Sequence, residues 1–516
     1  MTFRKLGSLI AIGTSAVIAG CTVGPNFVQP DSHLPEVSFL DDNAARTAAS
    51  RLPAPTDPTW WSLFHDPVLT RLEQRVADAN LDVRTATLRL AESRFQRGAV
   101  ASAEFPSING DGKYTREQYS KNGIASLLSG LLGPNAGGGF APGPLNEYNV
   151  GFDASWELDL WGRVRRQVEA ADAQVDQAAD QRRDALVSSL AELARDYLQL
   201  RGLQTQIRIA DDNLKVDRDI LDLAQERQQR GLQNGLDVEN AAAQVEAVRA
   251  QIPQLQQQES QAINALSLLL DQPPGALKTE LGLRTAAGIG PPRIPLGIPS
   301  ELARRRPDIR AAEDALHAAT ANIGVAVGDF YPKFQLNGTV GFDSLEVKHL
   351  FDASSLQYMV GPNVTLPIFA GGRLRSTLEL REAQQQEAAI TYRKTVLQAW
   401  HDVVNALVAH RLELIRRARL RAQADHSRAA LDLARARYRD GVTEFLSVLD
   451  AERSLLQAEQ QYATSSTNVS LDLVQLFKAL GGGWETAFPD LPSETAAIPV
   501  PVSPLTVAVQ SAPAPD

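Results

Sequence analysis

The only cysteine of this 516-residue chain, Cys21, lies in a position suited to lipid attachment. It follows an apolar stretch that Arg4 and Lys5 precede. A stretch of this length is too short to span a membrane and has the charged flank of a secretory signal. Residues Ile18–Cys21 resemble the bacterial lipobox, in which small residues let a signal peptidase cut before a diacylated cysteine. We expect residues 1–20 to be a lipoprotein signal peptide and Cys21 to carry the lipid; the alternative is a free thiol after an ordinary signal peptide.

Side chains suited to catalysis or metal binding do not cluster in the sequence. Metal sites and nucleophilic catalysis need such side chains at ligand spacing or beside an activating base. The segments GGG at 137–139 and GGGW at 481–484 do not lie between a strand and a helix with a following Lys-Ser or Lys-Thr, so they are not phosphate loops. We expect no enzyme, no cofactor and no metal site. The seven histidines, which form no ligand-spaced pair, are His33, His65, His317, His349, His401, His410 and His426.

The charge of the chain argues against a nucleic-acid partner. The formal net charge is -10 and the isoelectric point is about 5.4, and the basic residues are scattered along the sequence. A protein that neutralises phosphates needs a clustered basic surface. We therefore expect no nucleic-acid binding.

The chain repeats itself at an offset of 210 residues. Residues 221–231 read LDLAQERQQRG, and residues 431–441 read LDLARARYRDG. Gly162 and Arg163 match Gly372 and Arg373 at the same offset. A repeat this long exceeds the roughly 20 to 50 residues of solenoid repeats, so it indicates a duplicated structural unit. Each unit is predicted to contain two strands and a pair of very long helices.

Four segments alternate between apolar and polar residues with a period of two, as strands do when their two faces differ. The clearest places Tyr148 and Trp156 on one face and Asp153 and Glu157 on the other. Each run has roughly the 9 to 11 residues that a tilted membrane strand needs, although the edge of a soluble sandwich is the alternative. In chain order, the predicted strands are Ile108–Thr115, Tyr148–Leu160, Phe334–Phe342 and Tyr358–Ile368.

Four strands are too few to close a membrane barrel, because the smallest such barrels have about eight. An open sheet edge in lipid would leave backbone groups without hydrogen-bond partners. The chain must therefore oligomerise to close a barrel. A dimer would supply eight strands and a trimer twelve, and only the trimer leaves a lumen.

The helices predicted between these strands are unusually long. Residues 164–230 contain no proline and one glycine, Gly202, and their apolar residues recur at steps of three or four. At about 1.5 Å per residue such a helix reaches roughly 100 Å. The second unit repeats the design over residues 374–440, and returning helices are predicted over residues 236–270 and 446–480. Pro253 is expected to kink the first returning helix. Shorter helices are expected over about 67–101 and 299–328, with Ser300 as an N-cap and a break near Pro307.

Together these features resemble the TolC-like outer-membrane efflux proteins, or outer membrane factors, and specifically the NodT-type lipoproteins of resistance-nodulation-division efflux systems. The resemblance covers roughly residues 18–484, and the order and spacing of its motifs carry it. These motifs are CTVGPNF at 21–27, WW at 60–61, FDASWELDLWGRVRR at 152–166, RRPDIRAAE at 305–313, FYPKFQLNGTVGF at 330–342 and FKALGGGW at 477–484.

The resemblance implies a mainly α-helical homotrimer whose chains share a twelve-stranded outer-membrane β-barrel. It also implies a coiled-coil-like helical barrel in the periplasm, with an equatorial region around its waist. The predicted segments are the signal peptide 1–20, the anchor and equatorial segment 21–65, the first repeat 66–280, an equatorial linker 281–298, the second repeat 299–484 and a tail 485–516. We expect the tail, which is rich in Pro, Ala and Val, to be disordered.

The family closes its periplasmic tip at rest, where the helix pairs turn, and opens it when adaptor and pump engage. Leu446 and Asp450 lie one helical turn apart on the second returning helix, so both could face the tunnel. The resemblance implies that they form the gate, as an apolar and an acidic ring. Leu446 matches Leu236 in the first repeat, but Asp450 matches Asn240, so one helix pair per subunit supplies the acidic ring.

Other residues of the two turns are candidates for contacts with partners or across the helix seam. Gly231, Gly235 and Gly441 are expected to lie in turns that face the adaptor. Arg227, Arg437 and Asp237 are candidates for salt bridges at the tip, and a solvated surface charge is the alternative for each arginine.

The resemblance implies the exit duct of a tripartite efflux pump. The implied partners are a periplasmic adaptor, or membrane fusion protein, an inner-membrane resistance-nodulation-division transporter and outer-membrane lipid. The duct would pass drugs or other toxic solutes and be lipid-anchored in the outer membrane while extending into the periplasm. The outlet of a type I protein-secretion system is the alternative. A passive porin would need neither long helices nor a closed tip.

Overall fold

The computed structural model describes residues 22–30, 58–118, 144–231, 234–282 and 305–489. The signal peptide, Cys21, Ser300, the linker beyond residue 282 and the tail beyond residue 489 lie outside these ranges. The chain divides into two units: residues 1–30, 92–177 and 312–392 form the first, and residues 31–91, 178–311 and 393–516 form the second.

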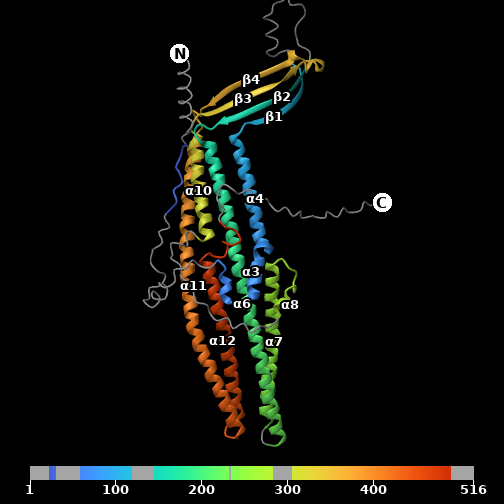
Figure 1. The fold of residues 1–516 in the computed structure, drawn as a ribbon, viewed down its shortest axis with the longest axis vertical. Helices are drawn as coiled ribbons and strands as arrows, with labels where there is room; N and C mark the ends of the chain where they lie inside the picture. Colours follow the sequence, from blue (N-terminus) through green and yellow to red (C-terminus); the bar gives the residue numbers. More distant parts are fainter. Residues whose placement is uncertain (1–21, 31–57, 119–143, 232–233, 283–304, 490–516) are drawn as a thin grey trace, which may run out of the picture. The chain divides into compact units, whose positions relative to one another are not determined.

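The first unit contains one antiparallel sheet of four strands in the order β1-β2-β3-β4 (Figure 1). The strands are β1 Ser107–Glu117, β2 Leu145–Leu158, β3 Lys333–Ser344 and β4 Leu356–Thr365. All four strands predicted from alternation are present. The central pairing of β2 with β3 joins the two copies of the repeat, with Val150 opposite Phe342 and Trp156 opposite Leu336.

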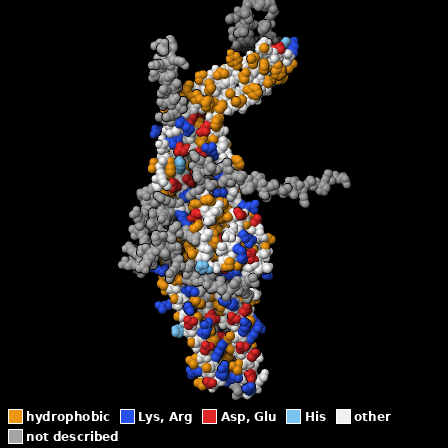
Figure 2. Space-filling view, in the orientation of Figure 1, with side chains coloured by type: hydrophobic (Ala, Val, Ile, Leu, Met, Phe, Trp, Pro, Cys, Tyr) orange, Lys and Arg blue, Asp and Glu red, His pale blue; other side chains and the backbone are white. Residues whose placement is uncertain are grey.

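The two faces of this sheet differ as the alternation predicts. On one face, polar side chains bond across strands: Asn109 donates to Asp153 over 3.1 Å, and the Ser155 hydroxyl lies 3.0 Å from the Asn337 oxygen. On the other face, Phe152 is 61 % exposed and Tyr358 is 79 % exposed. Figure 2 shows hydrophobic side chains gathered over the strands. Apolar side chains of all four strands are exposed on this face, among them Ile108, Val340 and Val360.

The glycines in the apolar register of β1 make room for the neighbouring strand. Gly110 pairs with Phe152, and a β-carbon added at Gly110 would lie 3.2 Å from the Phe152 ring. The Phe152 ring therefore lies over the position that a side chain at residue 110 would occupy.

The described residues that follow Cys21 pack within the first unit. The amide of Val23 donates to the carbonyl of Trp161 over 3.0 Å, and Arg166 donates to Asn26 over 2.6 Å. Phe27 stacks on His317 with 4.4 Å between ring centroids. The CTVGPNF motif is thus an ordered contact segment from Thr22 onward.

The long helices reproduce the duplication to the residue. Helix α6 is Arg163–Gln229 and α11 is Arg373–Arg439, each of 67 residues. The returning helices are α7, Gly235–Leu269, and α12, Phe445–Ala479, each of 35 residues. Every bound in the second copy lies 210 residues after its counterpart, and every predicted bound is within one residue of the observed one. Helix α7 continues through Pro253.

One of the shorter helices is divided where no break was predicted, whereas the break expected near Pro307 is present, at Arg306. The predicted helix 67–101 is divided into α3, Pro67–Ala79, and α4, Leu81–Ala101, because Asn80 ends one and caps the next. The Asn80 side-chain oxygen accepts from the amides of Asp82 and Val83, as a helix N-cap does. Helix α10 is Pro307–Gly328, so Pro307 occupies its first position, where a missing N–H costs nothing. The remaining short elements are η1 Trp60–Phe64, η2 Ser102–Glu104, α8 Lys278–Leu281, η3 Val347–His349 and η4 Ala353–Ser355.

The core of the second unit forms where η1, α3 and the ends of α7 and α12 meet α6. Trp60 stacks on Phe477 with 5.2 Å between ring centroids, and both are buried. The buried Tyr197 hydroxyl donates to Asp66 over 2.5 Å, and Asp66 also caps α3. The WW motif is therefore a packing motif. Among the described residues, no helix has both the length and the hydropathy of a transmembrane helix.

The single glycine of α6, Gly202, marks a close approach to α12. A β-carbon added at Gly202 would lie 2.5 Å from the hydroxyl oxygen of Thr467 and 3.2 Å from its β-carbon. Any larger side chain must push the two helices apart, since packed interiors do not absorb added volume.

We predict that Gly202→Leu lowers the free energy of unfolding by roughly 1–3 kcal/mol, the usual cost of overpacking. Thermal unfolding followed by circular dichroism measures this. Gly98→Ala is the matched control, because a β-carbon at this helical glycine of α4 meets nothing within 4 Å. The control should gain about 0.5–1 kcal/mol. Equal stability of the parent and Gly202→Leu would contradict the close approach.

Candidate functional site

Both turns between the long helices lie at the same end of the second unit, at the bottom of Figure 1. Gly441 has a φ of 76°, and its amide donates to Tyr438 while that of Val442 donates to Arg437. This is the Schellman pattern, which needs a left-handed residue after the helix. In the other turn Gly231 has a φ of 70°, and Asn234 caps α7 at the amide of Asp237. Gly235 is the first residue of α7, and residues 232 and 233 lie outside the described ranges.

The gate candidates lie on the exposed side of the first two turns of α12. Leu446 is 53 % exposed and Asp450 is also exposed. Phe445, Val448 and Leu449 point to the opposite side, where they join a buried cluster. The repeat equivalent Leu236 is likewise exposed on α7. Leu446 and Asp450 are thus available to a space outside the helix bundle of one chain, and their role as a gate stays a prediction.

Arg227, near the end of α6, contacts Tyr438 on α11 and not an acid. Its guanidinium donates to the Tyr438 carbonyl over 2.9 Å and lies 4.5 Å above the ring. A cation is favourable there because the last carbonyls of a helix carry partial negative charge. The Tyr438 ring also meets Phe445 edge-on at 5.7 Å. Arg227 therefore joins the two helix pairs at their turns.

The proposed salt bridges at the tip stay predictions for the assembled protein. Arg437 and Asp237 lie in the last turn of α11 and the first turn of α7, respectively. Neither Arg227 nor Arg437 forms an ion pair with another residue in the described part of this chain. Figure 2 shows side chains of both charges interspersed over these ends of the helices.

A buried polar cluster lies behind the turns, where all four long helices contribute a residue. Asp217 of α6 and Glu452 of α12 are both almost completely buried. Arg435 of α11 lies 3.5 Å from a Glu452 oxygen. Arg453 of α12 donates to the Gln244 oxygen of α7 over 3.0 Å. We call these five residues the four-helix polar cluster.

Burial changes the proton affinity of both acids in this cluster. It raises the pKa of Glu452 to about 8, and the neighbouring charge of Asp217 acts in the same direction. Burial also raises the pKa of Asp217. The two arginines oppose both shifts but do not overcome the loss of solvation.

The sequence contains a signal for this cluster that neither the strand alternation nor the family motifs include. Glu452 follows the buried Phe445, Val448 and Leu449 at helical spacing, so it falls on the apolar face of α12. Asp217 likewise falls between Leu214 and Ile220 on the apolar side of α6. An acid on the apolar side of a helix indicates a buried carboxyl that needs a partner or a proton.

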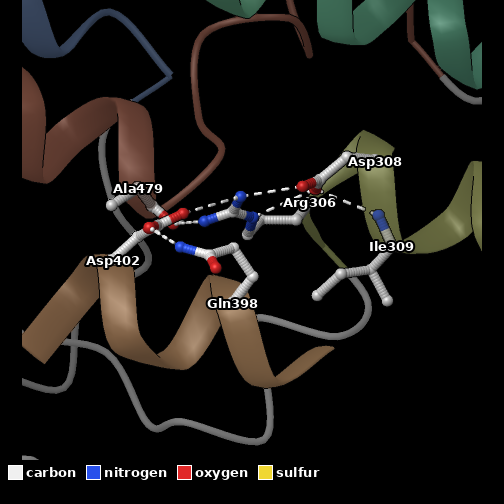
Figure 3. Close-up of polar contacts among 6 residues, drawn as sticks. All are labelled: Arg306, Asp308, Ile309, Gln398, Asp402 and Ala479. Atoms are coloured by element: carbon white, nitrogen blue, oxygen red, sulfur yellow. Dashed lines mark hydrogen bonds and ion pairs between the residues drawn. The ribbon is translucent and has the colours of Figure 1, made fainter. Parts of the chain in front are cut away.

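A second polar site holds the RRPDIRAAE motif to the two helices of the second repeat (Figure 3). Arg306 forms a bidentate contact with Asp308, at 3.0 and 2.7 Å, and donates to the Ala479 carbonyl over 2.9 Å. It also lies 3.5 Å from Asp402, which accepts from Gln398. A guanidinium thus joins the start of α10 to α11 and to the end of α12.

The glycines of FKALGGGW allow this contact. Gly481 has a φ of 69°, and a β-carbon there would lie 2.9 Å from the Arg306 α-carbon. Arg305 pairs with Glu485 over 2.9 Å, and its carbonyl accepts from the Trp484 indole over 3.2 Å. Two motifs from distant parts of the sequence therefore form one structural joint.

The cavity beside Arg306 is small and charged. Asp184, Asp402 and Lys478 are among its lining residues. Burial raises the pKa of Asp184, and the charge of Asp308 acts in the same direction. Among the described residues, no three acids, histidines or cysteines are grouped as metal ligands. Arg306 is paired with carboxylates from α10 and α11, so the site acts as a structural lock.

We predict that Arg306→Met lowers the free energy of unfolding by roughly 3 kcal/mol, because it leaves two carboxylates unpaired. This value is at the lower end for a buried pair, since Asp308 and Asp402 are each 30 % exposed. Thermal unfolding provides the measurement. Arg375→Met, which removes an exposed pair with Glu379, is the control and should change stability by at most about 1 kcal/mol. Similar losses in both variants would exclude a lock at Arg306.

Comparisons with known proteins identify the family to which this architecture is similar. Residues 72–272 and 298–482 match the model of the family described as "Outer membrane efflux protein". Outer membrane protein OprJ of Pseudomonas aeruginosa is 34 % identical over 482 residues, which cover 92 % of this chain and 96 % of OprJ. The probable outer membrane lipoprotein SilC of Salmonella typhimurium is 29 % identical, covering 92 % of this chain and 98 % of SilC. The solved structure of the outer-membrane channel OprN is similar with a TM-score of 0.80 and 33 % identity, over 90 % of this chain and all of OprN.

Proposed function

The chain belongs to the outer membrane efflux protein family, and on that premise we propose that it is the outer-membrane exit duct of a tripartite efflux pump. In this function, copies of the chain form a trimeric channel that passes small toxic solutes out of the cell. A periplasmic adaptor and an inner-membrane resistance-nodulation-division transporter supply those solutes. The channel is gated where its helix pairs turn.

The sheet of the first unit is the observation that carries this proposal. Its apolar face is exposed and its polar face is bridged by side-chain hydrogen bonds. Such a sheet suits lipid on one side and water on the other. Within the described residues, β1 and β4 each pair with one strand only. Lipid cannot satisfy the backbone groups on their free edges, so other copies of the chain must do so.

The antiparallel order of the sheet allows this closure by copies of one chain. With four strands in the order β1-β2-β3-β4, the β4 of one copy can pair antiparallel with the β1 of the next. Three copies give a barrel of twelve strands, which leaves a water-filled lumen. Two copies would give a barrel of eight strands, and side chains fill the interior of a barrel that small. The proposal therefore includes a homotrimer.

The anchored N-terminus fits an outer-membrane location. The residues that follow Cys21 pack on the first unit, which contains the sheet, through Val23, Asn26 and Phe27. Acylation of Cys21 would place its lipid at the end of this ordered segment. One acylated anchor binds membranes on the side where it inserts and does not itself span them.

The turns between the helix pairs supply the gate and the adaptor surface in this proposal. Leu446 and Asp450 face away from the buried cluster of one chain, so three copies could place them around a common axis. A ring of like charges selects and controls ions at such a constriction. Gly231, Gly235 and Gly441 shape the turns that an adaptor would meet.

The function is tested in a Gram-negative strain that lacks its outer-membrane efflux outlets. Expression of this chain with a periplasmic adaptor and a resistance-nodulation-division transporter should restore efflux of a fluorescent dye and resistance to toxic solutes. Secretion of a protein substrate without restored dye efflux would instead favour the type I secretion outlet. Neither activity, from protein shown to reach the outer membrane, would overturn the exit-duct function.

We predict that Leu446→Ala with Asp450→Ala raises the conductance of the purified protein in a planar bilayer by several-fold, because it removes both rings of the gate. Native mass spectrometry first confirms that parent and variant are trimers. Leu236→Ala with Asn240→Ala, at the equivalent positions of the first repeat, is the matched control and should have a smaller effect because it removes no charge. A trimeric double variant that conducts like the parent would place the gate elsewhere.

A further inference from the structure

The four-helix polar cluster contains two acids that no hydrogen bond satisfies. All four carboxylate oxygens of Asp217 and Glu452 are inaccessible to solvent and lack a hydrogen-bond partner. Two ionised carboxylates cannot bond to each other, because both are acceptors only. One proton would supply the missing donor and would remove one of two buried like charges. The geometry therefore suits a proton held between two carboxyl groups.

The charged groups that face the pair do not replace this proton. From α11, Arg435 approaches Glu452 only to 3.5 Å, and its Nε and Nη2 atoms also lack hydrogen-bond partners. From α12, Arg453 is bonded to Gln244, which is the neutral group that α7 contributes. Asp217 is the charged group from α6. The arginines reduce the net charge of the cluster but leave the carboxylate oxygens without donors.

The cluster lies directly behind the gate candidates. Glu452 is six residues along α12 from Leu446 and two from Asp450, on the buried side of the helix. Val448, Leu449 and Ile220 belong to the buried hydrophobic cluster at the same helix ends. Any loosening between α6 and α12 at this point would move the helix that carries Leu446 and Asp450.

The duplication does not produce a second copy of this cluster, which takes residues from both repeats. At the offset of 210, Asp217 corresponds to Ser427 and Glu452 to Ala242. The arginines Arg435 and Arg453 correspond to Gln225 and Ala243. Every charged member is therefore unmatched, although the helix bounds agree to the residue. Each chain has one cluster, and it bears on the helix that carries Asp450.

We propose that Asp217 and Glu452 form a proton-binding site that holds α12 against α6 while one proton is shared between them, and that loss of this proton loosens the packing behind Leu446 and Asp450. As a means of regulating the duct, this inference rests on the proposed function. As a proton site within the helix bundle, it can be tested without that function.

The direction of the pH effect follows from the raised pKa of the buried acid. The packed state binds the proton more tightly than a loosened state in which Glu452 meets water, so low pH favours packing. This contribution is complete below the ordinary pKa of a glutamate and is lost as pH rises through about 8. Between about pH 6 and about pH 9, linkage limits the change in the packed-to-loosened ratio to roughly 100-fold per subunit.

Hydrogen exchange of the purified trimer tests the proton site. After correction for intrinsic exchange rates, amides of residues 214–224 and 445–456 should lose protection by about 10-fold or more between about pH 6 and about pH 9. Glu452→Gln and Asp217→Asn each keep the size of the side chain and supply a permanent amide donor. Both variants should retain protection at the higher pH. The exposed acids Glu239 and Asp222 provide matched controls, and Glu239→Gln and Asp222→Asn should behave like the parent.

Single-channel recording over the same pH range tests the link to gating. The parent should open more often as pH rises, and Glu452→Gln should remove most of this dependence. Protection that is independent of pH in the parent, or equally pH-dependent in Glu452→Gln, would overturn the proton site. A proton site seen by exchange in a protein that never conducts would count against the proposed function alone. Exchange and conductance that respond to pH independently of each other would overturn the link to the gate.

Discussion

Backbone hydrogen bonding at the two free edges of the sheet is the constraint on which the rest of the molecule depends. The β2–β3 pairing joins the two copies of the repeat into one sheet, but it leaves β1 and β4 each with one unpaired side within the described residues. A sheet with an exposed apolar face and open edges is not stable alone in lipid or in water. The fold of one chain is therefore part of a larger structure, which only other copies can complete.

The two repeats share the bounds of their long helices but differ in some of their charged side chains. The four long helices match between repeats to the residue, yet two acids of α12 near the turn are not repeated: Asp450 and Glu452 correspond to Asn240 and Ala242. Helix bounds depend on apolar spacing and turn residues, which both copies keep. Charges at single positions do not determine those bounds, so an acid can be present at a position of one copy and absent from the equivalent position of the other.

Much of the fold could be predicted because its signals are periodic and long. Period two identified all four strands, and steps of three and four placed the long helices within one residue. Asn80 was missed because a cap within an otherwise helical pattern has no periodic signature. The partner of Arg227 was missed for a different reason: a backbone carbonyl and an aromatic ring 211 residues away leave no trace in charge patterns. Glu452 was readable from its place on an apolar face, but the family resemblance implied a role only for the neighbouring Leu446 and Asp450.

The long helices that are equivalent in the two repeats have equal lengths, and this also restricts how the sequence can evolve. An inserted residue in α11 rotates everything beyond it by about 100° and advances it by about 1.5 Å. The Gly202–Thr467 contact and the Arg227–Tyr438 contact would then both be lost. Insertions are therefore tolerable only as whole heptads made in all four helices together. Proteins that evolve from this chain should differ by substitutions in the long helices and by insertions and deletions in the loops. The length of the long helices should therefore change very little.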